Sequence, residues 1–151
     1  MPSIEEAIQQ PKFSSSIHRT QVNILYTASW LNQISGATLK NYGLSLQQFN
    51  ILRILRGRGG QPATVKLLTE RMLDKMSNAS RLVDKLKGKG YVKRQQCPTD
   101  RRRVDIVITE AGLDVINRAS DEVTRVTDEA FASLTTQEAD QLSFLLDKLR
   151  G

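Results

Sequence analysis

The 151-residue sequence predicts a mainly α-helical protein that carries one small β-hairpin. Two patterns and the composition support this class. Apolar residues recur every three or four positions over most of the chain, as they do on the buried face of a helix. Between about residues 91 and 109 the period changes to two, which is typical of strands. Hydrophobic residues make up 39% and charged residues 25%, as in soluble globular proteins.

The chain begins with an arm, residues 1–16, that precedes the first long helix. Ser3 and Glu6 have the spacing of a capping box at the start of a short helix, which Pro11 is expected to end. A periodic apolar stripe then predicts one long helix over residues 17–42, and Gly43 ends it.

Three shorter helices follow in the middle of the chain. Ser45 is expected to cap the first, which a glycine-rich segment ends after residue 56. The second begins near Thr64, and the third starts closely behind it and ends at Gly88. Ser77 is the preferred N-cap of this third helix, with Asp74 as the alternative. Two short apolar helices with a tight break between them predict a helix-turn-helix.

The period-two segment predicts a β-hairpin with a basic tip. Residues 91–95 form the first strand and residues 104–109 the second, and the loop between them contains three consecutive arginines. Thr109 is then expected to cap a long helix that runs to about residue 132. Thr135 and Glu138 repeat the capping-box spacing before a last helix that ends near residue 150.

The positive charge is concentrated in the centre of the sequence. The net charge is +6, but residues 53–103 alone hold fifteen basic and four acidic side chains, a net +11. The flanks hold the other seven basic and twelve acidic residues. A confined basic region between acidic ends favours a site for the phosphates of a nucleic acid.

Two groups of side chains in this basic region are candidates for contact with DNA. The exposed face of the third short helix suits the major groove, and we assign to it Ser77, Asn78, Ser80, Arg81 and Lys85. A solvated helix face is the alternative. The hairpin tip suits a minor groove, and an ordinary charged turn is its alternative; the tip comprises Asp100, Arg101, Arg102 and Arg103.

These residues carry a resemblance to the MarR family of bacterial winged-helix regulators. Residues 70–94, ERMLDKMSNASRLVDKLKGKGYVKR, resemble the recognition helix and first wing strand of that family. Residues 98–103, PTDRRR, followed by Val107, Ile108, Thr109 and Gly112, resemble its wing. The resemblance implies a winged helix-turn-helix DNA-binding domain over residues 43–109. Residues 17–42 and 110–151 would then be a helical dimerisation region.

The resemblance also implies roles for individual residues. Ser77, Asn78, Ser80 and Arg81 would lie in the major groove, Arg102 would reach the minor groove, and Asp100 would brace an arginine of the wing. Thr64 and Lys75 are expected at the DNA backbone. The protein would be a homodimeric, sequence-specific repressor of a pseudo-palindromic operator, relieved by a small-molecule effector. The alternative is a winged helix that binds nucleic acid non-specifically or architecturally, or that binds proteins.

Four aromatic residues and one cysteine are further candidates. Tyr26, Trp30, Tyr42 and Phe49 lie on or beside the first two helices, near where the family places its effector cleft. These residues are interpreted either as a pocket for a small aromatic or phenolic effector or as side chains that pack in the core or at a dimer interface. Cys97 departs from the family pattern, and an incidental exposed thiol competes there with a redox sensor whose thiol pKa is lowered by nearby basic residues.

Other classes find no support in the sequence. No apolar stretch approaches the length of a membrane span, and the acidic N-terminus does not resemble a secretory signal. A single cysteine agrees with a reducing compartment, so a cytoplasmic protein is expected. One histidine and no catalytic or nucleotide-binding motif predict neither a metal site, nor a cofactor, nor an enzyme.

Overall fold

The computed structural model describes residues 2–151 and confirms a mainly helical fold with one antiparallel hairpin. In chain order the elements are α1 (Ile4–Ala7), α2 (Ser16–Lys40), α3 (Leu46–Gly57), α4 (Val65–Arg71), α5 (Ala79–Gly88), β1 (Val92–Gln96), β2 (Val104–Ile108), α6 (Glu110–Phe131) and α7 (Thr136–Arg150).

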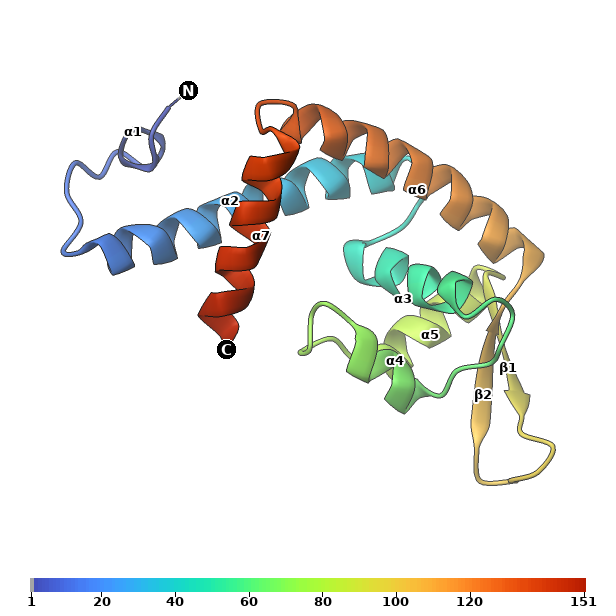
Figure 1. The fold of residues 1–151 in the computed structure, drawn as a ribbon. Coiled ribbons are helices and arrows are strands. Elements are labelled where there is room, and N and C mark those ends of the chain that lie inside the picture. The colour runs from blue at the N-terminus through green and yellow to red at the C-terminus, as the bar shows by residue number, and fades with distance from the viewer. Residues whose placement is uncertain (1) are drawn as a thin grey trace.

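The two long helices lie against each other above a compact unit. α2 packs along α6, while α3, α4, α5 and the hairpin lie beneath the C-terminal end of α2 and the N-terminal half of α6 (Figure 1). The hairpin projects from this unit at one end of α5, and the turn between α4 and α5 lies at the other end (Figure 1). A groove between α2 and α7 shows that α7 folds back beside α2.

One hydrophobic core holds the compact unit together. It buries the inner faces of α3, α4, α5 and both strands, and it also takes in the ends of α2 and α6. The helices α2 and α6, which the sequence predicts to mediate dimerisation, therefore also pack against the compact unit. The most deeply buried side chains of this core include Leu39, Ile51, Leu52, Leu55, Leu68, Val83, Leu86, Ile106 and Ile116.

Gly112 sets the angle at which α6 leaves the hairpin. A Cβ atom at this position would lie 2.2 Å from the backbone oxygen of Tyr91 and 2.8 Å from Cγ1 of Ile108. Thr109 fastens the same corner, because its hydroxyl donates to the carbonyl of Gly90 at 2.7 Å and accepts the amide of Gly112 at 3.0 Å. Only glycine fits so close to a backbone oxygen.

Most helix starts agree with the sequence. Ser45, Thr64, Thr109 and Thr135 accept the expected N-terminal amide hydrogen bonds, and Ser45 and Thr135 form full capping boxes. The N-cap of α5 was predicted wrongly. It is Asn78, whose Oδ1 accepts the backbone amide of Arg81 at 3.1 Å, and not Ser77 or Asp74.

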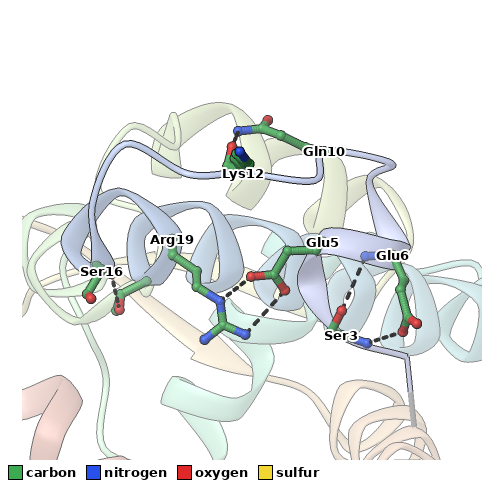
Figure 2. A network of polar contacts seen from close by, with 8 residues as sticks. Ser3, Glu5, Glu6, Gln10, Lys12, Ser16 and Arg19 are labelled. Atoms are coloured by element: carbon green, nitrogen blue, oxygen red, sulfur yellow. Dashed lines mark hydrogen bonds and ion pairs between the residues drawn. The ribbon is translucent and has the colours of Figure 1, made fainter.

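The N-terminal arm folds back onto α2. Figure 2 shows Glu5 bound to Arg19 through two contacts, at 2.5 and 3.2 Å. Ile4 is buried, and Ser3 and Glu6 form the expected capping box. The short helix α1 ends before Ile8 rather than at Pro11, and Gln9 then adopts a φ of 55°. The arm is an ordered element attached to the first turns of α2.

Candidate nucleic-acid interface

The helix α5 divides into a buried face and an exposed polar face. Ala79, Val83 and Leu86 are buried in the core, which fixes the rotation of the helix about its axis. The opposite face exposes polar and charged side chains, namely Ser80, Arg81, Asp84, Lys85 and Lys87. The face assigned from the sequence to DNA is therefore free of contacts with the core.

The two residues before α5 differ in what they offer to a ligand. Asn78 is exposed, and because its Oδ1 caps the helix, its side-chain NH2 remains free to donate. Ser77 is half-buried, and its hydroxyl is shielded from solvent without a hydrogen-bond partner within residues 2–151. In this arrangement Asn78 presents its side chain outward and Ser77 does not.

The turn between α4 and α5 is held by side chains. The Oδ1 atom of Asn50 on α3 accepts the amide of Leu73 at 2.8 Å, and Oδ1 of Asp74 accepts the amide of Met76 at 3.0 Å. Lys75 donates to the backbone carbonyl of Glu70. The turn thus has a defined backbone, and it places Lys75 beside the end of α4.

The hairpin pairs β1 with β2 in antiparallel register, from Val92 opposite Ile108 to Gln96 opposite Val104. At the tip, Oδ1 of Asp100 accepts the backbone amide of Arg102 at 2.9 Å. Asp100 therefore holds an arginine of the wing, Arg102, through the backbone amide of that residue, and its part in DNA binding stays a prediction.

The three arginines of the tip are not equivalent. Arg103 donates from Nε to Oδ1 of Asp105 at 2.8 Å, and Asp105 is almost fully buried. This contact also raises the pKa of Arg103. Arg101 and Arg102 are exposed and form no ion pair among the residues that the structure describes. The wing therefore presents two free guanidinium groups and holds the third against β2.

Arg94 joins the wing to α5, a link that the sequence did not reveal. Its Nη2 lies 2.7 Å from Oδ1 of Asp84 and 3.4 Å from the backbone oxygen of Ser80. Asp84 is the one acidic side chain on the exposed face of α5 and stands out in the sequence for that reason. The ion pair offsets a charge that would otherwise repel phosphates.

Cys97 is buried at the start of the wing loop, contrary to the expectation of an exposed thiol. Its Sγ lies 3.3 Å from the hydroxyl of Thr99. Hydrogen bonds from the side chain and then the backbone of Thr99 lower the pKa of the thiol. Basic neighbours were expected to lower the pKa of this thiol, whereas in the structure the hydrogen bonds of Thr99 lower it.

The four aromatic candidates for an effector pocket occupy different environments. Tyr26 and Trp30 are exposed on α2, and Phe49 is buried on α3 under the guanidinium of Arg53. Tyr42 donates its hydroxyl to Oε2 of Glu122 at 2.5 Å, and this bond is the main reason that its pKa is raised. Tyr42 thus ties the end of α2 to α6.

A cavity of about 690 Å³ does lie between the end of α2 and the start of α3. None of the four aromatic candidates lines it. Its walls include the polar side chains of Asn32, Gln33 and Lys40 on α2 and Gln47 on α3.

The helices α2 and α7 expose an apolar surface of their own. No residue of α7 is buried, and a groove of about 630 Å³ runs between the two helices. Large apolar side chains that remain exposed here are Ile17 and Leu25 on α2 and Leu142, Phe144, Leu145 and Leu149 on α7. We call these six residues the α2/α7 face.

Within residues 2–151, no helix combines the length and apolar character needed to cross a membrane. The same residues contain no group of three or more His, Cys, Asp or Glu side chains placed to hold a metal ion.

A helix-turn-helix followed directly by a β-hairpin wing defines the class of winged-helix proteins. A sequence profile of the MarR family matches residues 42–103, from the end of α2 to the wing tip. YkoM of Bacillus subtilis, an HTH-type transcriptional regulator, is 30% identical over 109 residues, which cover 72% of this chain and 70% of YkoM. The chain therefore belongs to the MarR family of DNA-binding, winged helix-turn-helix transcriptional regulators.

Solved structures support the same fold. The organohalide-sensing transcriptional regulator RdhR, crystallised with 2,4-dichlorophenol, is 26% identical with a TM-score of 0.83, over 93% of this chain and 83% of RdhR. A mutant MarR from E. coli in complex with operator DNA is 22% identical with a TM-score of 0.79, over 91% of this chain and 98% of that one.

Proposed function

We propose that this regulator is a homodimeric, sequence-specific repressor that binds a pseudo-palindromic operator and is released by a small-molecule effector. One observation carries the proposal. The exposed face of α5 and the two free arginines of the wing belong to one basic unit, while the α2/α7 face leaves an apolar surface uncovered. The first surface suits DNA, and the second suits another copy of the chain.

In the proposed complex α5 lies in the major groove of each half-site. Arg81 and Asn78 can donate to base edges, and Ser80 and Lys85 contact bases or phosphates beside them. Ser77 is proposed to contact the major groove after its shielded hydroxyl rotates outward, and until then it supports binding only through the shape of the turn. Arg101 and Arg102 reach the flanking minor groove, whereas Arg103 and Asp100 maintain the tip that presents them. Thr64 and Lys75 lie nearest the DNA backbone.

The α2/α7 face is the proposed dimer interface. In a symmetric dimer each of these residues contributes to the interface once from each copy, so even a small set of leucines buries a useful apolar area. Two copies would present two basic units to one duplex, with half-sites about one helical turn apart. Most acidic residues of the flanks lie on α6 and α7, which are not proposed to contact the phosphates.

The effector is proposed to be a small aromatic or phenolic molecule. RdhR, a structural relative that binds 2,4-dichlorophenol, supports this ligand class. Tyr26, Trp30, Tyr42 and Phe49 remain its proposed contacts. Tyr42 is the best placed of them to transmit binding, because its bond to Glu122 connects α2 with α6. Release of that bond would alter the spacing of the two recognition helices.

The protein is proposed to act by binding alone, in the cytoplasm, without a cofactor and without enzymatic activity. These points rest on the family and on the character of the surfaces described above. Access to chromosomal DNA requires a location in the same compartment as the DNA.

Selection of bound duplexes from a random DNA pool tests the proposed function. We expect a pseudo-palindromic consensus and binding at least about a thousandfold tighter than to random duplex, with a steep dependence on salt. Arg81→Ala should relax the base preference. Arg125→Ala on α6, which removes an exposed arginine outside α5 and the wing, should leave both affinity and preference unchanged. Uniform weakening by Arg81→Ala, with no consensus, would favour the non-specific or architectural alternative.

A further inference from the structure

The turn between α4 and α5 exposes two large apolar side chains. Leu73 is 85% exposed and Met76 is 92% exposed, which makes Met76 the most exposed large apolar side chain in the described part of the chain. Neither contributes to the core, and both lie within the most basic third of the sequence. Single exposed apolar side chains are common on protein surfaces, so exposure alone assigns no role, and the position of each side chain relative to α5 decides.

The exposure of Met76 does not result from a loose backbone. Its amide donates to Oδ1 of Asp74 at 3.0 Å, and the amide of Ser77 donates to the carbonyl of Asp74 at 3.2 Å. Upstream, Asn50 anchors the amide of Leu73 to α3. The turn is therefore held in one shape, and that shape points Met76 away from the core.

Met76 shares an open hollow with the exposed side chains of α5. The hollow, of about 440 Å³, is lined from α5 and its cap by Asn78, Arg81 and Lys85, and from the turn by Met76. The other side is formed by the start of α3, with Ser45 and Gln47. Leu73 lies in the same turn and is not part of this lining. Met76 alone of the two apolar side chains adjoins the groups proposed to read base edges.

The major groove offers one apolar group to such a side chain. Among the four base pairs, only A·T and T·A pairs carry a methyl group there, at C5 of thymine. Methionine suits this contact, because its unbranched and polarisable side chain adapts to an irregular apolar surface. The polar neighbours of Met76 would bind the adjacent hydrogen-bonding edges and the phosphates.

We propose that Met76 is a specificity-determining residue that packs against the C5-methyl group of a thymine in each half-site. The inference rests on the proposed function, since it requires α5 to lie in the major groove. It adds a contact that reads a base without a hydrogen bond, and it predicts a thymine at one fixed position of each half-site.

Replacement of single thymines by deoxyuridine in the selected operator tests the contact, because this change removes only the methyl group. For the unsubstituted protein, one position in each half-site should lose about fourfold in affinity per methyl group. Met76→Ala should bind the thymine operator more weakly and show no further loss with deoxyuridine at that position. Met76→Leu, which keeps an apolar side chain, should retain part of the methyl effect.

Leu73→Ala is the matched control, since it truncates a second exposed apolar side chain in the same turn. It should keep the full deoxyuridine effect. The inference is overturned if no position responds to loss of the methyl group, or if Met76→Ala responds as the unsubstituted protein does. A pool that yields no consensus would contradict the proposed function and the thymine contact together, whereas a consensus without methyl dependence contradicts only the contact.

Discussion

The compact unit of α3, α4, α5 and the hairpin, called the winged-helix unit below, buries its apolar residues, whereas the α2/α7 face exposes them. The winged-helix unit closes a core around Ile51, Leu52 and Val83, and it exposes mainly polar and basic groups. The helix α7 buries none of its residues and exposes Phe144 and Leu149. One region is thus complete within a single chain, and the other has the character of half an interface. The difference separates residues that maintain the fold from residues that the proposed dimer would bury.

The largest effect should come from the corner where the core meets α6. Gly112→Ala places a Cβ atom 2.2 Å from the Tyr91 backbone oxygen, so we expect it to lower the free energy of unfolding by about 3 kcal/mol. Urea denaturation at fixed protein concentration measures this loss. Gly36→Ala on α2 is the control, because nothing lies within 4 Å of its Cβ position, and helix propensity should make it neutral or stabilising. Equal effects would contradict the described packing at Gly112.

The second prediction concerns the α2/α7 face. Leu145→Glu should raise the dimer dissociation constant by about a hundredfold, because a symmetric interface loses two buried leucines of roughly 1.5 kcal/mol each. Sedimentation equilibrium measures the change. Lys148→Glu alters charge on the same helix without removing an apolar group and should have a much smaller effect. A Leu145→Glu protein that remains fully dimeric would place the interface elsewhere.

The third prediction separates two neighbouring arginines of the wing. Arg102→Ala should weaken operator binding about tenfold and leave thermal stability unchanged, because its side chain has no partner within the described residues. Arg103→Ala should instead lower the melting temperature, since it leaves the buried carboxylate of Asp105 without its ion pair. Titrations with operator DNA and thermal melts distinguish the two. Identical profiles for both variants would argue against the pairing of Arg103 with Asp105.

The smallest effect is expected in the arm. Arg19 lowers the pKa of Glu5 to about 2, so the contribution of this ion pair to holding the arm is complete above pH 4.5 and is lost as the pH falls toward 2. Glu5→Gln should increase hydrogen exchange of the α1 amides at neutral pH and leave α5 unaffected. Glu6→Gln keeps an acceptor for the capping box and serves as the control. NMR titration of Glu5 with a midpoint near 4.5 would show that the ion pair does not form in solution.

Local signals in the sequence predicted most of the fold. Ser45, Thr109 and Thr135 cap helices because a short polar side chain can reach the first free amides wherever it precedes an apolar stripe. The same signal failed at α5, where Ser77 and Asn78 are adjacent and both are good caps. Packing of Ala79 and Leu86 in the core decided between them, and the sequence alone does not contain that information.

Long-range pairs account for what could not be predicted at the site. Tyr42 and Glu122 are 80 residues apart, and Arg94 meets Asp84 only because β1 returns beside α5. At the wing, the sequence analysis names only Asp100 as a partner for an arginine, although Asp105 also lies close to the three arginines in the chain. The turn geometry assigns Asp100 to the backbone and leaves Asp105 for Arg103. The charge density of the sequence predicts the region of the candidate site, whereas the pairing of its charges depends on the fold.

The central claim is that two copies of the chain, joined at the α2/α7 face, place two basic winged-helix units on one duplex. Insertion of five base pairs between the half-sites of the selected operator tests it most directly, because half a helical turn moves one half-site to the opposite side of the duplex. We predict a loss of affinity of about a hundredfold or more, with recovery after a second insertion of five base pairs. Affinity that does not change with the insertion would contradict the account.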